Sequence, residues 1–380
     1  MRVLHIITGL TQGGAESALY RLTTSEQNCS IEHIIISLVD FGVYGQQFQK
    51  MGIQTHMIGM PRGRPTLNGL VKLYYLIKKI NPNIVQTWMY HSDLIGGIIA
   101  KLAGYDNIIW GVVHFNLEKG VTNFSTRLTA KLCAFLSYYI PKKIISCSES
   151  ATRVHEKIGY YSKKFTYIPL GFDTVQLNRD DKSRSTLRKE WKLDDNIIIF
   201  GCLARWNPQK DHKNLLNAFS IVRKKFPNIY CVLGGREIDL KNSDLNNLIH
   251  EAESINNNIL LTGVVDKIPS FMNAIDIHIL SSVGEAFPNV VAEAMSCETI
   301  CIVTDVGDAC KIVDKLGWVV PPGNSDILAS AMIEAISMMN DKKNWEQLKR
   351  DSRIRICENY SINRMISDYI ATWNAVENNY

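Results

Sequence analysis

The chain has 380 residues, of which 46% are hydrophobic and 21% are charged. This composition excludes a disordered chain, and the length favours two domains of ordinary size. No stretch reaches the roughly 18 uncharged apolar residues of a membrane span, and the nine cysteines include no C-x-x-C pair. We therefore expect a cytoplasmic protein with reduced thiols and, because no cleavage site follows "MRVLHIITGL", no export signal.

Short apolar runs alternate with helical patterns along the first half of the chain. Strands are predicted at Val3–Ile7, Glu32–Leu38, Gln54–Ile58, Ile84–Thr87, Ile108–His114, Lys143–Cys147 and Phe165–Ile168. Helical patterns between them include Ala15–Leu22, Leu67–Ile80, Asp93–Leu102 and Thr126–Tyr139. Strands that are joined by helices form parallel sheets covered on both faces, so this half is predicted to be a doubly wound α/β domain.

The second half repeats this pattern after a polar linker, which we place at about 170–183. Its strands are predicted at Ile197–Leu203, Tyr230–Leu233, Ile259–Leu261, Ile277–Leu280 and Ile300–Val303. The chain ends in an amphipathic helix with Tyr369, Ile370 and Trp373 on its apolar side, and that side must pack against other parts of the protein. The predicted domains are 1–172 and 173–360, followed by the helix 361–380.

Charge is divided unevenly between the two halves. Residues 1–172 hold 18 Lys and Arg against 9 Asp and Glu, a net charge of +9, while the remainder holds 24 against 28, a net of −4. This asymmetry suggests an anionic partner for the first domain, the alternative being a solvated basic surface. The segments "LVKLYYLIKKINP" and "LTAKLCAFLSYYIPKK" interleave apolar residues with lysines, as helices at a membrane interface do, unless their apolar faces are buried against the sheet.

The segment "SSVGEAFPNVVAEAM" follows the predicted strand Ile277–Leu280 and contains two glutamates. Glu285 lies in a turn and Glu293 about two helical turns later, a span of about 12 Å along a helix axis. That span matches the distance from a sugar, across a diphosphate, to a ribose, and each carboxylate can accept hydrogen bonds from hydroxyl groups. The helix start between them suits phosphate, and it includes Ala286, Phe287, Pro288 and Asn289. The alternative is a helix-dipole partner and an exposed helix charge.

Two further loops carry candidate binding residues. In "ARWNPQKDHKNLL", Arg205 and Lys210 follow a strand and can hold a diphosphate, although lysine-rich loops are often only solvated surface. In "TGLTQGGAESAL", Gly13 and Gly14 separate the first strand from the first helix and permit close backbone approach to a ligand. Their spacing fails the dinucleotide fingerprint because Thr11 stands where that fingerprint needs glycine.

Two histidines stand where the chain leaves a predicted strand. His114 ends "IIWGVVHF", and His91 lies in "WMYHSDLIGG", where one interpretation is a role in binding a second substrate, the acceptor of a transferred group. For each, the alternative is a structural histidine held by hydrogen bonds.

Together "GGAES", "GVVHF", "ARWNPQKDHKNLL" and "GEAFPNVVAEAM…VTDVGDA" resemble the retaining GT-B glycosyltransferases of family 4 over nearly the whole chain. The resemblance implies two Rossmann-like domains facing a cleft, with the acceptor in the first, the nucleotide-sugar in the second and the last helix crossing back to the first. It places Arg205 and Lys210 on the diphosphate, Glu285 on the donor sugar and Glu293 on the ribose. His114 matches the histidine near the reacting sugar, and Gly13 and Gly14 match the loop under the donor phosphates.

The chain departs from the family pattern at two positions. Glu298 in "CETI" replaces a common glycine, which affects how the preceding helix ends, and Asp308 follows Gly307 where a second glycine is common. Neither change removes a proposed chemical group. The segment "VGDACKIVDKLGWVVPPGN" most resembles the branch that makes bacterial surface polysaccharides.

We therefore expect a retaining glycosyltransferase that needs no cofactor and, lacking a D-x-D pair, no metal. It is expected to move a sugar from a UDP-sugar of the UDP-GalNAc, UDP-GlcNAc or UDP-Gal type to a polyprenyl-diphosphate-linked saccharide in O-antigen and lipopolysaccharide assembly. Its expected location is the inner face of the bacterial cytoplasmic membrane, as a peripheral protein with no nucleic-acid partner. A sugar-nucleotide epimerase of the same architecture and a non-catalytic nucleotide-sugar-binding protein are the alternatives.

Overall fold

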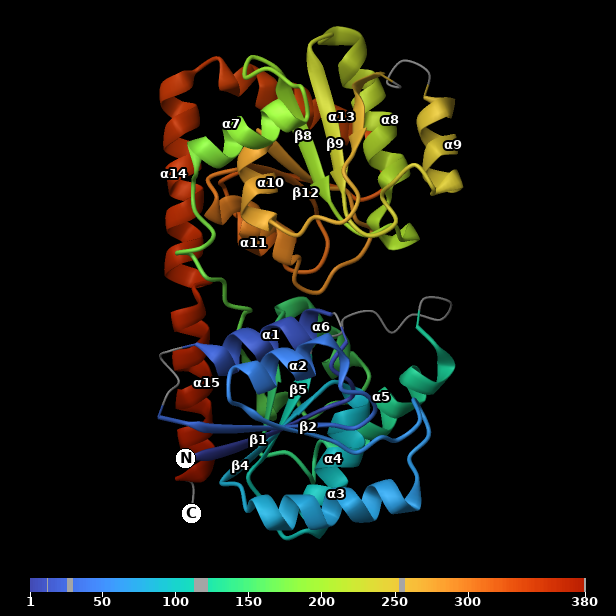
Figure 1. The fold of residues 1–380 in the computed structure, drawn as a ribbon, viewed down its shortest axis with the longest axis vertical. Coiled ribbons are helices and arrows are strands. Elements are labelled where there is room, and N and C mark those ends of the chain that lie inside the picture. Colours follow the sequence, from blue (N-terminus) through green and yellow to red (C-terminus); the bar gives the residue numbers. More distant parts are fainter. Residues whose placement is uncertain (12, 26–29, 113–121, 253–256, 379–380) are drawn as a thin grey trace. The chain divides into compact units, whose positions relative to one another are not determined.

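The computed structural model describes residues 1–11, 13–25, 30–112, 122–252 and 257–378. Its contacts divide the chain into two compact units, residues 1–171 with 362–380, and residues 172–361. Each unit holds one parallel β-sheet with helices packed on it (Figure 1). The predicted fold class of two doubly wound α/β domains is confirmed. Among the described helices, none combines the length and apolar character that crossing a bilayer requires.

The first unit is built on a seven-stranded sheet in the order β3-β2-β1-β4-β5-β6-β7. Its strands are β1 (Arg2–Ile7), β2 (Glu32–Ser37), β3 (Gln54–Met57), β4 (Ile84–Trp88), β5 (Ile108–Val112), β6 (Lys143–Ser146) and β7 (Phe165–Tyr167). All pairings are parallel, and Val3 of β1 lies between His33 of β2 and Ile84 of β4. The central strands are fully buried, as strands covered on both faces must be.

Seven α-helices belong to this unit within the described residues. They are α1 (Gly14–Thr24), α2 (Gly42–Lys50), α3 (Leu67–Ile80), α4 (Tyr90–Leu102), α5 (Phe124–Leu136), α6 (Glu149–Lys157) and α15 (Ile362–Glu377). Helix α4 packs between α3 and α5, and together they cover one face of the sheet. Each buries a face at helical spacing, for example Leu73 and Ile77 of α3 and Cys133 of α5.

Helix α15, the last in the chain, packs on this first unit through its aromatic face. Trp373 is fully buried, and its Nε1 donates to Oε1 of Gln86 in β4 at 3.3 Å. Tyr369 stacks on Trp88 with ring centroids 6.0 Å apart. The apolar side expected from the sequence therefore lies against the sheet, with Ile370 at its margin.

Two buried histidines lie beneath α15 in a defined hydrogen-bonded chain. Nε1 of Trp88 donates to Nδ1 of His5 at 3.2 Å, so the proton of His5 resides on Nε2. That Nε2 lies 3.0 Å from Nδ1 of His33, which must accept. Burial lowers the pKa of His33 to about 4 and the pKa of His5 well below its ordinary value, so both rings are neutral.

The second unit contains a six-stranded sheet in the order β10-β9-β8-β11-β12-β13. Its strands are β8 (Ile198–Leu203), β9 (Ile229–Gly234), β10 (Ile259–Leu261), β11 (Ile277–Leu280), β12 (Ile300–Thr304) and β13 (Trp318–Val320). Its helices are α7 (Asp181–Glu190), α8 (His212–Lys225), α9 (Ser243–Glu251), α10 (Ile268–Ala274), α11 (Asn289–Ser296), α12 (Ala309–Val313), α13 (Ser325–Met339) and α14 (Lys342–Asn359). Helices α8 and α13 pack together over one face of the sheet and bury Leu215, Phe219 and Met332.

Arginines of α7 fasten this helix to the amino end of β11. The side chain of Arg188 is almost fully buried, and it donates to the Ala274 carbonyl oxygen at 2.8 Å and to Oδ2 of Asp276 at 2.7 Å. Arg184 donates to Oδ1 of the same aspartate at 2.6 Å. The Asp276 carboxylate is thus paired on both oxygens, which offsets the cost of burying Arg188.

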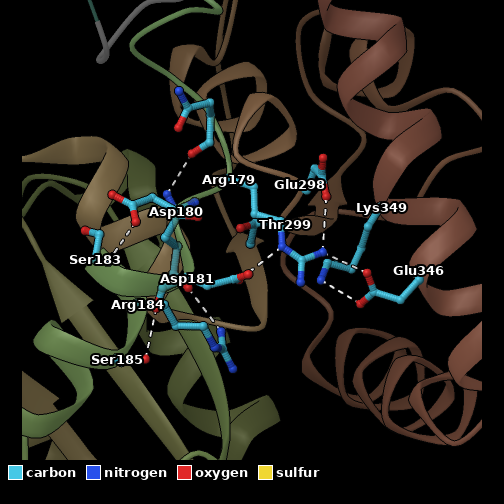
Figure 2. A network of polar contacts seen from close by, with 12 residues as sticks. Arg179, Asp180, Asp181, Ser183, Arg184, Ser185, Glu298, Thr299, Glu346 and Lys349 are labelled. Carbon is cyan, nitrogen blue, oxygen red and sulfur yellow. Dashed lines mark hydrogen bonds and ion pairs between the residues drawn. The ribbon is translucent and has the colours of Figure 1, made fainter.

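Glu298, which departs from the family pattern described above, adopts a left-handed conformation with φ of 62° after α11. This conformation is costly for a residue with a Cβ atom. Its carboxylate lies 3.4 Å from Nη1 of Arg179, which also pairs with Glu346 of α14 at 2.8 Å and with Asp181 at 3.1 Å (Figure 2). The ion pair with Arg179 therefore offsets the cost of the left-handed conformation at the end of α11, a conformation that glycine would adopt without such a cost.

The buried histidine chain leads us to expect that the first unit loses stability in acid. Because the folded-state pKa of His33 lies below the unfolded value of about 6.5, the unfolded chain binds more protons as the pH falls. The contribution is fully present above about pH 6.5 and is lost as the pH approaches 4. His33→Asn, whose amide oxygen can still accept from His5, should reduce this loss, measured by urea unfolding between pH 7.5 and 5.

The matched control is His250→Asn at an exposed position of α9. It should leave the pH dependence of the unfolding free energy as it is in the unsubstituted protein. An identical pH dependence in the His33 and His250 variants would show that the His5–His33 pair does not carry the effect.

Candidate functional site

Each sheet has one point at which the order of its strands reverses. In the first sheet the reversal lies between β1 and β4, and in the second it lies between β8 and β11. Doubly wound proteins bind ligands beyond the carboxyl ends of the strands at such a switch point, because neighbouring loops there leave in opposite directions. The candidate residues that the structure describes all follow these four strands, so each unit is treated below as a half-site of its own.

In the second unit, the loops after β8 and β11 lie side by side and are tied through their backbones. The N–H of Val283 donates to the Gln209 carbonyl oxygen at 2.9 Å. The hydroxyl of Ser281 donates to the carbonyl oxygen of Lys210 at 2.8 Å. A short 3-10 helix at Pro208–Lys210, capped by the Asn207 side chain, shapes the first of the two loops. These contacts fix the positions of Lys210 and Glu285 relative to each other.

Lys210 and Glu285 form an ion pair across the switch point. Nζ of Lys210 lies 2.5 Å from Oε1 of Glu285, and the hydroxyl of Ser282 donates to the same oxygen at 2.7 Å. Both side chains are mostly buried but reach solvent. Oε2 of Glu285 has no hydrogen-bond partner among the described residues, so it can accept from a ligand hydroxyl. The sequence indicated these two residues separately, and the structure brings them together.

The Glu285 loop is supported from below by the loop after β12. Gly307 has φ of 58°, and a Cβ atom there would lie 2.4 Å from the Glu285 carbonyl oxygen and 2.5 Å from that of Ala286. The N–H of Asp308 donates to the Ala286 oxygen at 3.0 Å. The hydroxyl of Thr304 donates to the carbonyl oxygen of Ser282 at 2.6 Å. Only glycine fits position 307. Asp308 contributes its backbone N–H to the contact with the Glu285 loop.

Helix α11 begins at Asn289, with Pro288 at its N-cap, so the N–H groups of Asn289 and Val290 have no carbonyl partner within the helix. The N–H of Val291 donates to the Pro288 carbonyl oxygen at 3.1 Å. Glu293 lies one turn into the helix and is half-buried. The Phe287 side chain is buried and stacks on Phe172 at 6.0 Å, so its part in a phosphate site is confined to its backbone. Sequence reasoning included Phe287 in the donor site without seeing this packing role.

Arg205 is exposed in the loop after β8. No carboxylate pairs with it among the residues that the structure describes. The neighbouring backbone is held by the loop after β9, because the N–H of Trp206 donates to the Arg236 carbonyl oxygen at 2.9 Å. Gly235 has φ of 141°, and a Cβ there would lie 2.1 Å from the Ala204 carbonyl oxygen. Our sequence analysis missed Gly235, although the paired glycines after β9 are a signal for it.

In the first unit, the loops after β1 and β4 meet at the other switch point. The hydroxyls of Thr8 and Ser92 are 3.0 Å apart. Gly13 is the N-cap of α1 with extended backbone, and a Cβ there would meet the carboxylate of Glu16. A Cβ at Gly14 would meet nothing within 4 Å, so open space adjoins this backbone. The approach of a ligand to the backbone of these glycines stays a prediction.

His91 lies in the first turn of α4, directly after β4, and is half-buried. Burial lowers its pKa, which favours the neutral ring. His114, the other candidate histidine, lies outside the described residues, which end at Val112 in β5 and resume at 122. Within the described residues, no group of three or more histidine, cysteine or acidic side chains is placed to hold a metal ion.

Comparison with known proteins gives matches along most of the chain. Residues 183–352 match the family model "Glycosyl transferases group 1", and residues 12–176 match "Glycosyltransferase Family 4". The UDP-Gal:alpha-D-GlcNAc-diphosphoundecaprenol alpha-1,3-galactosyltransferase of Escherichia coli is 25% identical over 311 residues, 78% of this chain and 76% of that protein. The capsular polysaccharide biosynthesis glycosyltransferase CapM of Staphylococcus aureus is 27% identical over 310 residues, 78% and 77% of the two chains.

Among solved structures, Anabaena HepE in complex with UDP has a TM-score of 0.86 at 18% identity. The superposition covers 99% of this chain and 100% of HepE. At this level of identity the likeness establishes the fold.

The support of the Glu285 loop by Gly307 can be tested by adding one methyl group. Gly307→Ala places a Cβ against two carbonyl oxygens and also forces alanine into a left-handed conformation. We expect a loss of about 1 kcal/mol from the backbone conformation and about 1–3 kcal/mol more from the clash. The measurement is the free energy of unfolding in urea.

Gly323→Ala is the control, because Gly323 has φ of 69° and open space around the added Cβ. It should show the conformational cost alone. Equal losses in the two alanine variants would mean that contact with the Glu285 loop contributes nothing.

Proposed function

Because the chain belongs to the glycosyltransferases described by these two family models, we propose that it moves a hexosyl or N-acetylhexosaminyl group from a UDP-sugar to a polyprenyl-diphosphate-linked saccharide. The proposed reaction retains the anomeric configuration and needs no metal. The observation that carries the proposal is the switch point of the second unit, where Lys210 and Glu285 form an ion pair beyond the carboxyl ends of β8 and β11 and Arg205 lies in the same loop as Lys210. The named activities of the Escherichia coli and Staphylococcus aureus relatives support a role in surface polysaccharide assembly, such as O-antigen.

In the proposed donor complex, the diphosphate lies over the start of α11 between Arg205 and Lys210. The ammonium of Lys210 has three N–H donors, so it can keep its bond to Glu285 while it contacts a phosphate. Glu285 accepts from a hydroxyl of the transferred sugar through Oε2, and Glu293 accepts from the ribose. Backbone N–H groups of Ala286, Phe287 and Asn289 are proposed to donate to the phosphates, whereas Pro288 has no N–H group.

The proposed chemistry uses no covalent enzyme intermediate. The bond from the sugar C1 to the diphosphate oxygen breaks, and the acceptor oxygen bonds to C1 from the same face. The acceptor proton passes to the departing diphosphate, so that UDP leaves as the second product. Arg205, Lys210 and the amides of α11 stabilise the negative charge that develops on the diphosphate.

We assign the acceptor to the first unit, near the loop that carries His91, whereas the loop of Gly13 and Gly14 is proposed to lie under the donor phosphates. Gly14 offers open backbone, and the neutral His91 can accept or donate a hydrogen bond. His114 is proposed to lie near the reacting sugar on the strength of the family resemblance alone. An epimerase or a non-catalytic binding protein would have the same fold, but the family models favour transfer.

The outer surfaces of α3 and α5 support peripheral attachment to the inner face of the cytoplasmic membrane. Each helix buries one face against the rest of the unit and exposes apolar side chains on another face. Burial against the sheet and contact with a membrane are therefore compatible. On α5 the exposed stripe, called here the α5 stripe, consists of Phe124, Leu128, Leu132 and Phe135. Helix α3 exposes Leu67, Val71 and Tyr75, with Lys72, Lys78 and Lys79 beside them. Apolar residues interleaved with lysines suit an interface with anionic lipid.

The donor site is tested by removing its carboxylates. Glu285→Ala should reduce turnover about a hundredfold or more, the scale of losing one preorganised stabilising group. Glu293→Ala should weaken donor binding more than it slows turnover, because its proposed partner is the ribose. Release of UDP in the presence of a lipid-diphosphate saccharide gives turnover, and calorimetry gives donor affinity. Near-normal values for both variants would contradict the assignment.

The cation of the ion pair has a matched control a few residues away. Lys210→Ala should strongly depress turnover, whereas Lys213→Ala, at an exposed position of α8, should change it little. A chelator should have little effect on the unsubstituted enzyme. Loss of activity in EDTA that a divalent ion restores would contradict the metal-independent mechanism.

Membrane attachment is tested by sedimentation with liposomes. The full chain should bind anionic liposomes at low salt, because each surface lysine contributes about 1 kcal/mol there, and it should dissociate at high salt. Phe124→Ser with Phe135→Ser should weaken binding, whereas Leu240→Ser, an exposed leucine of the second unit, should not. Equal binding to neutral liposomes, or equal loss in the control, would contradict this mode of attachment.

A further inference from the structure

The first unit contains a cavity of about 530 Å³ at the edge of its sheet opposite the switch point. Lys142 and Lys143 meet at the amino end of β6, Lys164 precedes β7, and Asp106 precedes β5. Lys101 reaches the cavity from the last turn of α4. Because the candidate residues of the reaction follow the carboxyl ends of the strands, this cavity is a separate feature of the unit.

The lining of this cavity, called here the lysine cavity, has an excess of positive charge. Its charged side chains are four lysines and one aspartate, a net charge of +3. Asp106 is paired with Lys101, which lowers the pKa of the carboxyl. Lys164 is held by neutral acceptors, the carbonyl oxygens of Ser137 at 2.9 Å and Tyr138 at 2.8 Å. Nζ of Lys142 donates to Oδ1 of Asn107 at 2.8 Å.

These contacts orient the ammonium groups. Among the described residues that line the cavity, lysines outnumber carboxylates by four to one. Burial and the nearby charge of Lys101 lower the pKa of Lys164, as expected where cations are crowded together. An anionic group with several acceptor oxygens would relieve this repulsion. The phosphodiester of an anionic phospholipid is such a group, and lysine ammonium groups bind phosphate as point charges.

The lysine cavity is continuous with the apolar surface of α5. Tyr139 lines the cavity and is 66% exposed, and its ring lies 5.6 Å from that of Phe135, the last residue of the α5 stripe. Leu102, which follows Lys101, is 68% exposed. Phosphate-binding charge and exposed apolar side chains thus adjoin each other, so the surface fits a ligand with an anionic head and an apolar tail.

We propose that the lysine cavity binds the phosphate headgroup of an anionic membrane phospholipid while the α5 stripe and Tyr139 contact the acyl chains. This proposal rests on the peripheral attachment proposed above, and it adds a defined lipid site to a diffuse electrostatic attraction. A soluble phosphate compound would use the cavity but would gain nothing from the adjoining apolar side chains, which is why a lipid is favoured.

The test uses the full chain and dihexanoyl phosphatidylglycerol below its critical micelle concentration, with binding measured by calorimetry. The unsubstituted protein should bind one lipid per chain. K142Q/K143Q should weaken binding at least about tenfold, since two lysines each contribute about 1 kcal/mol. K50Q/K157Q, which removes two exposed lysines of α2 and α6 outside the cavity, should bind as the unsubstituted protein does.

Two further ligands separate the sources of phosphate. Inorganic phosphate should bind at least tenfold more weakly than the lipid, and dihexanoyl phosphatidylcholine should also bind weakly. If inorganic phosphate binds as tightly as the lipid, the cavity is a site for soluble anions and the lipid assignment is wrong. Equal losses in the two double variants, or no saturable binding of one lipid per chain, would overturn the proposal.

Turnover with a water-soluble acceptor analogue distinguishes failure of this proposal from failure of the proposed function. Both double variants should keep the turnover of the unsubstituted enzyme, because neither alters a residue at a switch point. Absence of turnover in all three proteins, with lipid binding as expected, would overturn the proposed transfer reaction and leave the lipid site standing. Circular dichroism spectra should match, so that a folding defect is detected directly.

Discussion

The chemistry proposed for this protein depends on the reversal of strand order in a parallel sheet. Parallel strands bring their carboxyl ends to one edge, and at the reversal two strands far apart in sequence become neighbours. In the second unit this places Lys210 and Glu285, 75 positions apart, within 2.5 Å. Local structure alone does not bring these two residues together. The ion pair is therefore a property of the sheet order, and the remaining contacts of the half-site serve to keep it in place.

Those contacts are hydrogen bonds that all end on backbone carbonyl oxygens, so they tie the loops together through the main chain. Loops after three successive neighbours in the sheet, β8, β11 and β12, are joined by hydrogen bonds from Val283, Ser281, Thr304 and Asp308. Gly307 allows the loop after β12 to contact the backbone of Glu285. Such preorganisation suits catalysis by positioning and charge stabilisation, because no large rearrangement then has to accompany the developing charge.

Patterns within single segments could be predicted from the sequence, and contacts between segments could not. Alternating apolar runs report which face of an element is buried, so the two parallel α/β domains and the apolar side of α15 followed from them. The burial of Phe287 against Phe172 could not, because it depends on how distant segments pack. The ion pair of Glu298 with Arg179 likewise could not be predicted, because the sequence shows only that Glu298 departs from the family pattern. Our sequence analysis missed Gly235, although its glycine pair is visible.

In the first unit, the two proposed binding functions, for acceptor and for lipid, lie at opposite ends of the parallel strands. The loops of Gly14 and His91 follow the carboxyl ends of its strands, whereas the lysines of the lysine cavity gather near the amino ends. Strand direction alone therefore keeps the cationic surface away from the residues assigned to the acceptor. The excess of basic residues in this half of the chain need not serve acceptor binding at all. If lysines lay at both ends of the strands, a phosphate-bearing acceptor could also bind at the amino ends, away from the proposed reaction site. Keeping the lysines at the amino ends only therefore favours productive binding of the acceptor at the carboxyl ends.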